Sequence, residues 1–236
     1  MQKNILVVGG NSGIGLSLIK MLSAQGHQIM HLSRTQSEVL QELHIPHITW
    51  DVKNPLPITL ENDLPDTLHG LVYCPGTINL KPFHRLTEDE FLEDFQINVL
   101  GAVKILQASL KSLKKAKQAS VVLYSTVAAR LGMNFHSSIA VAKSGVEGLC
   151  KSLAAEWAMY GVRVNAIAPS LTDTPLASKL LSSDEKREAS AKRHPLGKIG
   201  QPEDIASLTA FLLSDQANWI TGQMIGVDGG MGALKP

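Results

Sequence analysis

The sequence alternates short apolar, β-branched runs with longer helical patterns from one end to the other. Strands separated in this way by helices pair in parallel, and near-continuous apolar runs indicate strands that are covered on both faces. Right-handed crossovers then place helices on both sides of a doubly wound sheet. The seven expected strands are Ile5–Val8, Gln28–Leu32, His47–Trp50, Gly70–Tyr73, Ser120–Tyr124, Arg163–Ile167 and Met224–Val227.

Length and composition agree with one globular α/β domain over residues 1–236. Single domains of this class run to roughly 200–250 residues, and 44% hydrophobic with 18% charged residues is unlike a disordered chain. Lys and Arg number 22 against 21 acids, and the cluster from Lys111 to Lys117 is interpreted as the solvated end of a helix. Nucleic acid is therefore not an expected partner.

Targeting signals and metal-ligand patterns are missing from the sequence. The apolar run Ile5–Val8 follows the first residues at once, without a signal-peptide layout, and no apolar stretch reaches about 20 residues. Cys74 and Cys150 lie in apolar contexts without metal-ligand spacing, so we expect two buried thiols and no disulfide. The expectation is a cytoplasmic protein that neither binds a metal nor enters a membrane.

A glycine-rich turn follows the first expected strand and leads into a helical pattern. Its residues are Gly9-Gly10-Asn11-Ser12-Gly13-Ile14-Gly15. Glycines permit a tight turn and close backbone approach, while a helix N-terminus offers free N–H groups to a pyrophosphate. The spacing differs from G-x-G-x-x-G, so a purely structural turn is the alternative. The pattern favours a Rossmann-type site for a dinucleotide.

Ser33-Arg34 follows the second expected strand, where NAD-preferring folds usually place an acid that bonds the ribose 2′-OH. The guanidinium of Arg34 suits a 2′-phosphate instead. NADP is therefore the expected cofactor and NAD remains possible, because an unpaired surface arginine is also common.

Two further patterns concern helices. Thr87 with Glu90 forms a capping box that opens a helix to about Lys114, and apolar residues recur at helical spacing from Ile139 to Trp157. The polar region 175–200 is long enough for one or two short helices over the site. It is expected to be a substrate lid, and a surface excursion without a function is the alternative.

Over its whole length the chain resembles a short-chain dehydrogenase/reductase, with Gly9-x-x-x-Gly13-Ile14-Gly15 matching that family's cofactor turn. The resemblance implies that Asp51-Val52 contacts adenine and that Cys74-Pro75-Gly76 lies beside the ribose. It places Asn98 in the catalytic tetrad, Pro169 in the family's Pro-Gly segment, and Thr172 and Thr174 at the nicotinamide carboxamide. Val8, Cys74 and Ser170 replace the family's usual Thr, Asn and Gly, which weakens the transfer of individual contacts.

The largest departure from the family lies in the tetrad. The family's Tyr-x-x-x-Lys corresponds to Ile139-Ala140-Val141-Ala142-Lys143, so the lysine is kept and the tyrosine is lost. Thirteen residues before Ile139, the family's usual interval to its serine, stands Thr126. The adjacent Ser125 would need a one-residue insertion. The resemblance implies that Thr126 bonds the substrate carbonyl and that Lys143 binds the nicotinamide ribose.

Loss of the tyrosine removes a proton donor and a fixed hydrogen bond to the growing oxyanion. Such groups typically contribute about 10²–10⁴-fold and 10²–10³-fold, so the usual mechanism is crippled although slow turnover is not forbidden. His136 is the first candidate replacement, because if the helix has begun there it shares a face with position 139. Ser138 and Tyr124 are weaker candidates, and water is a further one.

The leading hypothesis is an NADP(H)-dependent oxidoreductase acting on a small carbonyl or alcohol, with an altered proton donor. The competing hypothesis is a dinucleotide-binding protein with little or no catalysis, such as a sensor or a partner subunit. A pure scaffold fits Arg34 and the glycine turn poorly. The family commonly forms dimers or tetramers, so a homodimer or homotetramer is expected.

Overall fold

One seven-stranded parallel sheet is the centre of the structure, a computed structural model that describes residues 2–235. The strand order is β3-β2-β1-β4-β5-β6-β7. The strands are β1 (Asn4–Val8), β2 (Gln28–Ser33), β3 (His47–Thr49), β4 (Gly70–Tyr73), β5 (Ala119–Tyr124), β6 (Val162–Pro169) and β7 (Met224–Val227). The doubly wound Rossmann-type fold and all seven expected strands are confirmed, with bounds that differ by at most two residues at either end.

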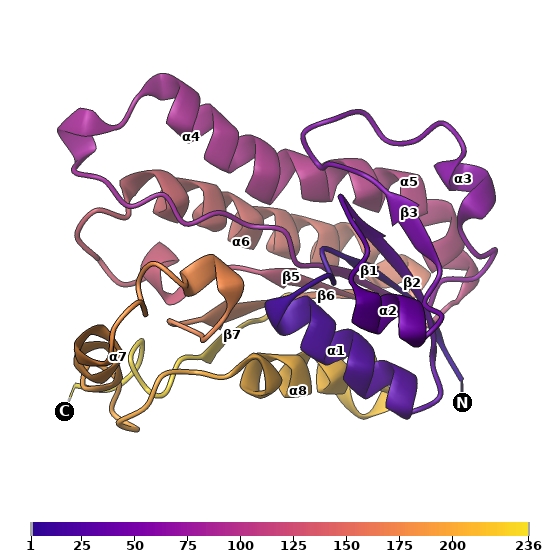
Figure 1. Ribbon diagram of the computed structural model, residues 1–236. Coiled ribbons are helices and arrows are strands. Elements are labelled where there is room, and N and C mark those ends of the chain that lie inside the picture. Colours follow the sequence, from indigo (N-terminus) through magenta and orange to yellow (C-terminus); the bar gives the residue numbers. More distant parts are fainter. Residues whose placement is uncertain (1, 236) are drawn as a thin grey trace.

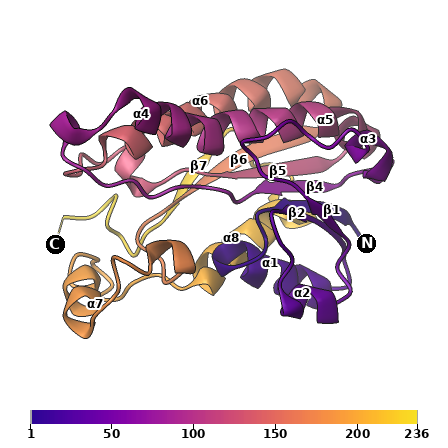
Figure 2. The same ribbon diagram turned by 45° about the horizontal axis from the view of Figure 1, so that its top comes forward.

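Helices cover both faces of this sheet, as Figures 1 and 2 show. On one side lie α1 (Gly13–Ala24), α2 (Glu38–Glu42) and α8 (Pro202–Leu213). On the other lie α3 (Leu60–Asp63), α4 (Glu88–Phe95), α5 (Gly101–Lys115) and α6 (Ser137–Trp157). Two apolar cores result, because alternate strand residues face opposite sides: Ile5 and Val7 pack toward α1, whereas Leu6 and Val8 pack toward α5.

The helical segment after Thr87 is continuous but not uniform. Thr87 and Glu90 form the expected capping box at the start of α4. A π-helical stretch, η2 (Gln96–Leu100), then joins α4 to α5, which ends at Lys115. Such π-bulges frequently occur at functional sites. Here the bulge carries Asn98.

Region 175–200 lies beyond the carboxyl ends of the strands. It holds η5 (Pro175–Ala177) and α7 (Asp184–Ala191), and Figure 1 shows α7 at the same end of the molecule as β7. The region was expected to hold one or two short helices, and the structure shows two. The remaining short helices are η1 (Phe83–Arg85), η3 (Val127–Ala129), η4 (Ala158–Tyr160) and η6 (Asp215–Ala217).

Neither a membrane span nor a metal cluster is found between residues 2 and 235. No helix there is long and apolar enough to cross a bilayer. No group of three or more His, Cys, Asp or Glu side chains in that range is arranged to hold a metal ion. Cys74 and Cys150 are free thiols.

Candidate dinucleotide-binding and active site

A cavity of about 780 Å³ opens at the carboxyl ends of the strands, where ligands of open α/β sheets bind. This volume lies within the range of about 300–1,000 Å³ that is typical of small-molecule and cofactor sites. Its wall contains every residue expected to bind the dinucleotide: Gly9, Asn11, Ser12, Gly13, Ile14, Gly15, Ser33, Arg34, Asp51, Val52, Cys74, Gly76, Lys143, Pro169, Thr172 and Thr174. Of the expected catalytic residues, Thr126, His136 and Lys143 line it and Asn98 does not.

The glycine turn needs its glycines for steric reasons. Gly9 and Gly13 have φ values of +78° and +52°, which side chains rarely adopt. A Cβ at Gly15 would lie 2.7 Å from Gly10 Cα and from Gly9 O. Helix α1 can therefore approach the turn closely only when position 15 is glycine. The N-terminus of α1 lies in the cavity wall.

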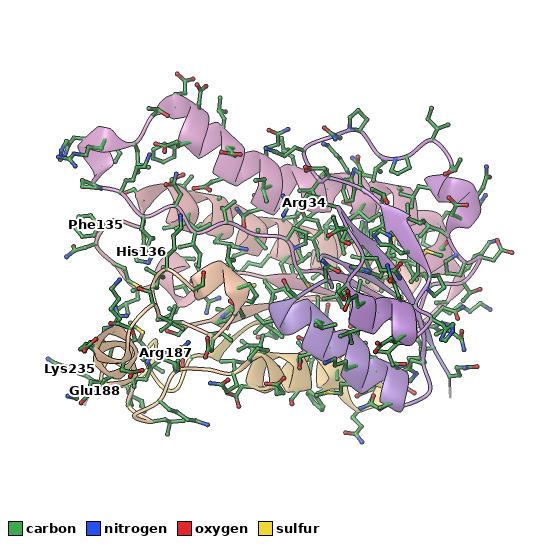
Figure 3. The ribbon with its side chains drawn as sticks, viewed as in Figure 1. Arg34, Phe135, His136, Arg187, Glu188 and Lys235 are labelled. Carbon is green, nitrogen blue, oxygen red and sulfur yellow. The ribbon has the colours of Figure 1, made fainter. Side chains whose placement is uncertain are left out.

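Two hydrogen bonds of Asn11 hold the glycine turn against the segment after β2. Asn11 donates to Thr35 Oγ1 at 3.1 Å and accepts from the Ser37 backbone N–H at 2.5 Å. Arg34, which precedes Thr35, is exposed on the cavity wall and forms no ion pair with any residue of the range 2–235. Figure 3 shows Arg34 near the middle of the molecule and His136 toward the left of the view. The arginine is thus available to an anionic ligand.

Lys143 and Asn98 meet at Gly76. A Cβ on Gly76 would lie 3.3 Å from Lys143 Nζ and 3.2 Å from Asn98 Oδ1. Asn98 Nδ2 donates to Thr77 Oγ1 and to Asp94 O, whereas its buried Oδ1 has no partner among the described residues. Asn98 is 1% exposed, so it lies behind the cavity wall, where its amide bonds Asp94 and Thr77.

Lys143 is held almost fully inside the protein. Its Nζ donates to the backbone carbonyl of Tyr124 at 2.8 Å, and no carboxylate pairs with it among the described residues. Burial lowers the pKa of Lys143 to about 8, although the neighbouring Cys74 and Asp94 favour its charged form. Burial likewise raises the pKa of the Cys74 thiol to about 12, which keeps it protonated.

Ser125 and Thr126, which follow β5, both line the cavity, but the hydroxyl of Ser125 is engaged by a carboxylate. Ser125 Oγ donates to Glu147 Oε1 at 2.8 Å, and Glu147 is held in turn by Arg130. Thr126 Oγ1 accepts from the Ala128 N–H at 3.3 Å and lies 3.5 Å from Pro169 O. These are long contacts that a substrate oxygen can replace.

Ile139 occupies the cavity wall one helical turn before Lys143 and is 5% exposed. Helix α6 begins at Ser137, and His136 precedes it with φ −103°, so the condition that the helix already includes His136 is not met. His136 still lines the cavity, with its Nδ1 2.6 Å from Asn134 O.

The hydroxyl groups of the two weaker candidates for proton donation are bonded to other side chains, although Tyr124 also lines the cavity. Tyr124 OH lies 2.7 Å from Thr209 Oγ1, on the α8 side, and burial raises its pKa well above the usual value. Ser138 Oγ donates to the buried carboxylate of Asp94 at 2.5 Å and does not line the cavity.

The loop after β6 connects the cavity to region 175–200. Thr174 packs on the glycine turn, since a Cβ on Gly13 would lie 3.1 Å from Thr174 Cγ2. Arg187 of α7 pairs with Asp173 at 2.6 Å. Six residues of region 175–200 line the cavity: Pro175, Leu176, Ala177, Leu180, Arg193 and His194.

Sequence reasoning did not identify Ser170 and His194 as a pair. Ser170 Oγ lies 2.8 Å from His194 Nε2, and both residues line the cavity. They stand 24 positions apart, and region 175–200 carries no motif. The only available signal was the serine at the position of the family's usual glycine.

Comparison with known proteins identifies the family. The sequence model of the family described as Enoyl-(Acyl carrier protein) reductase matches residues 8–232. A tropinone reductase homologue of Arabidopsis thaliana is 34% identical over 96% of this chain and 78% of its own length. The chain belongs to the short-chain dehydrogenase/reductase family. A second Arabidopsis tropinone reductase homologue is 33% identical over 97% of this chain and 92% of its own length.

Solved structures of other short-chain dehydrogenases/reductases share the fold. A short-chain dehydrogenase/reductase from Mycobacterium ulcerans is 30% identical, with a TM-score of 0.89 over 98% of this chain and 90% of that one. ElxO, in a variant whose tyrosine is replaced by phenylalanine, was solved with NADPH bound. That variant is 25% identical, with a TM-score of 0.89 over 99% of this chain and 100% of its own.

Proposed function

We propose that this protein is an NADP(H)-dependent oxidoreductase that moves a hydride to or from a small carbonyl or alcohol, with an altered proton donor. The observation that carries the proposal is the single cavity that joins Arg34 at one end to Thr126 and Lys143 at the other. An unpaired guanidinium, a glycine turn and a buried cation along one wall are the donor set that a phosphorylated dinucleotide requires.

The residues that would hold the dinucleotide follow from their chemistry. Arg34 suits the 2′-phosphate, the N–H groups at the start of α1 suit the pyrophosphate, and Lys143 suits the nicotinamide ribose. Asp51, Val52, Cys74 and Gly76 would line the adenosine side, and Pro169, Thr172 and Thr174 the nicotinamide side. When bound, the nicotinamide supplies or accepts a hydride.

In this proposal the chain's own groups act on the substrate oxygen. Thr126 Oγ1 donates to it and so stabilises the negative charge that grows during carbonyl reduction. Ile139, at the position of the family's tyrosine, supplies neither a proton nor a hydrogen bond. The proton must therefore come from another group at the cavity or from solvent, and His136 is the candidate next to helix α6.

We propose that region 175–200 is a lid on the single domain. Its contacts support this assignment, because Leu176, Leu180 and His194 line the cavity while the Asp173–Arg187 ion pair fastens α7 to the loop that packs on the glycine turn. A closed lid excludes water, which strengthens each polar contact inside.

We also propose that the protein forms a homodimer or homotetramer and lies in the cytoplasm. Light scattering of the purified protein tests the oligomeric state, and cell fractionation tests the localisation.

A second candidate function is dinucleotide binding with little or no catalysis. The buried, apolar side chain of Ile139 favours it, because it lies one turn from Lys143, where an ionisable hydroxyl would otherwise stand. The ElxO variant was solved with NADPH bound although one tyrosine hydroxyl is missing, so that protein holds the dinucleotide without this hydroxyl. A protein with this second function would act as a sensor or as a partner subunit.

Fluorescence titration with NADPH and NADH, followed by NADPH oxidation against aldehydes, ketones and quinones, tests the proposal. We expect tighter binding of NADPH and slow, measurable reduction of at least one compound. Binding without turnover supports the second function, and failure to bind either dinucleotide overturns both.

Two variants sharpen the test of the altered proton donor. Ile139→Tyr should increase carbonyl reduction by about 10²-fold or more, because general acids contribute about 10²–10⁴-fold. A folded variant without any gain contradicts the assignment of position 139. His136→Ala should slow reduction, and the exposed His84→Ala serves as its matched control.

A further inference from the structure

Ser170 and His194 form a hydrogen-bonded pair on the cavity wall. Ser170 directly follows β6, and His194 follows α7 with only 4% of its surface exposed. Ser170 Oγ lies 2.8 Å from His194 Nε2, and His194 Nδ1 lies 2.8 Å from the Ser190 carbonyl oxygen. A serine hydroxyl is thus backed by an imidazole that a third group orients, which is the arrangement of activated nucleophiles and proton relays.

The carbonyl of Ser190 decides which ring nitrogen carries the proton. A carbonyl oxygen only accepts, so Nδ1 is the protonated nitrogen of the neutral ring and Nε2 accepts from the Ser170 hydroxyl. When the ring is charged, Nε2–H donates to Ser170 Oγ instead. The hydroxyl proton of Ser170 is then left with Met231 Sδ, 3.1 Å away, which is a weak acceptor.

The pair lies next to the group that is expected to polarise the substrate. Thr126 Oγ1 lies 3.5 Å from the carbonyl of Pro169, the residue before Ser170, and strands β5 and β6 are paired as far as Tyr124 and Ile167. Thr126 and Ser170 are therefore neighbours at the ends of adjacent strands. Ile139 lines the same cavity without any hydrogen-bonding group.

Arg193 precedes His194 in the chain, Asp228 precedes Gly229, which packs on His194, and both charged side chains are engaged elsewhere. Arg193 donates to Ser190 Oγ at 3.1 Å, and Asp228 accepts from two backbone N–H groups of the turn that follows it. Neither forms an ion pair with the ring, so the exchange of a proton with Ser170 depends on the pair itself.

We infer that Ser170 is the proton donor of the altered active site and that His194 supplies its proton. The inference rests on the proposed function, with a reduced nicotinamide dinucleotide as the hydride source. As the hydride adds to the carbonyl carbon, the C=O π electrons move to oxygen, which takes the proton of Ser170 Oγ. Ser170 takes the Nε2 proton of the charged His194 ring, which becomes neutral and keeps its proton on Nδ1. Alcohol oxidation runs the same transfers in reverse.

Two histidines can then be compared as proton sources. His136 precedes α6, is only partly buried, and has no hydroxyl group between its ring and the cavity in the contacts that the structure shows. His194 is buried, oriented by a backbone carbonyl and joined to a hydroxyl on the wall. The geometry thus favours Ser170 and His194 over the histidine that the sequence pattern suggested.

The experiment measures single-turnover reduction of the best panel substrate by NADPH, together with NADPH affinity and thermal unfolding. Ser170→Ala and His194→Gln should each slow the reduction by about 10²-fold or more, with unchanged NADPH affinity. Ser152→Ala and His84→Gln, both exposed outside the cavity, are the matched controls, and His136→Ala should have a smaller effect.

A second readout does not depend on turnover. Nitrogen-15 NMR of labelled histidines, with His194→Gln to assign the signal, should show the neutral His194 ring protonated on Nδ1, and Ser170→Ala should change the chemical shift of its Nε2. A neutral ring protonated on Nε2 overturns the inference. Unchanged rates in Ser170→Ala with an active wild type overturn it as well, whereas a wild type that reduces nothing refutes the proposed function itself.

Discussion

The two ends of the cavity are built by different means. At the end formed by β1 and β2, the shape comes from backbone: glycines with positive φ, the N-terminus of α1 and a loop tied down by Asn11. At the end formed by β5, β6 and region 175–200, it comes from side chains, among them Thr126, Ile139 and Ser170. Backbone geometry tolerates change at few positions, whereas a side chain can be exchanged singly.

This difference explains how dinucleotide binding and proton transfer can separate. At the first end, a Cβ on Gly15 would collide with backbone, and Gly9 and Gly13 have positive φ, so sterics constrain these glycines. At the second end, the proposed function gives buried Ile139 the place of a proton donor, and exchanging this one side chain would change the chemistry without moving the backbone. The predictions below test this contrast by altering one end and measuring both binding and turnover.

Gly15→Ala should have the largest effect. Its Cβ would lie 2.7 Å from two backbone atoms of the glycine turn, so the turn must shift. Overpacking typically costs about 1–3 kcal/mol, and a displaced phosphate site should weaken NADPH binding by roughly 100-fold. Fluorescence titration and thermal unfolding measure the two effects.

The control is Gly148→Ala in α6, where an added Cβ meets nothing within 4 Å. Alanine is the better helix former by roughly 1 kcal/mol, so this variant should be slightly more stable and bind NADPH normally. Equal binding by the two variants would show that the glycine turn is only structural.

Arg34→Gln should separate the two dinucleotides. A charge-assisted hydrogen bond contributes roughly 1.5–3 kcal/mol, so NADPH should bind about 10- to 100-fold more weakly while NADH changes little. Parallel titrations with both dinucleotides measure the ratio. An equal loss for both, or none for either, removes the 2′-phosphate from the assignment.

The sequence predicted the first end of the cavity better than the second. The alternation of strands and helices, the glycine turn and Arg34 are local patterns whose physical meaning does not depend on distant residues. The pairing of Ser170 with His194 depends on how region 175–200 folds back, and no local pattern encodes that contact. His136 looked suitable because its spacing from Ile139 assumed that the helix includes His136. Helix α6 begins one residue later, at Ser137.

Lys143 should make dinucleotide binding depend on pH. In the folded protein without ligand its pKa is about 8, below the ordinary 10.5, so the side chain loses its charge as the pH rises through 8. An anionic dinucleotide favours the charged form and raises that pKa, so binding takes up a proton and affinity should fall by up to about tenfold per pH unit above 8. Titrations between pH 7 and pH 9.5 measure this slope.

Lys143→Met should abolish the slope and weaken binding at pH 7, whereas the exposed Lys151→Met should leave both unchanged. The free energy of unfolding should change with pH in the opposite direction to the dinucleotide affinity. Between pH 8 and 10.5 the unfolded chain holds a proton that the folded, unliganded chain has lost, so the free energy of unfolding should rise with pH in that window. A slope that persists in Lys143→Met would assign the titration to another group.

Arg187→Gln should have the smallest effect, and it concerns the boundary between the two ends. The Arg187–Asp173 ion pair joins α7 to the loop that packs on the glycine turn, but both side chains are partly exposed, and such pairs contribute little. NADPH should therefore dissociate only about two- to threefold faster, as stopped-flow fluorescence measures, and Asp173→Asn should have the same effect. The double variant should add nothing further, because either change removes the one contact. If dissociation is unchanged in all three, α7 does not hold the cofactor end closed, and region 175–200 contributes to the reaction end alone.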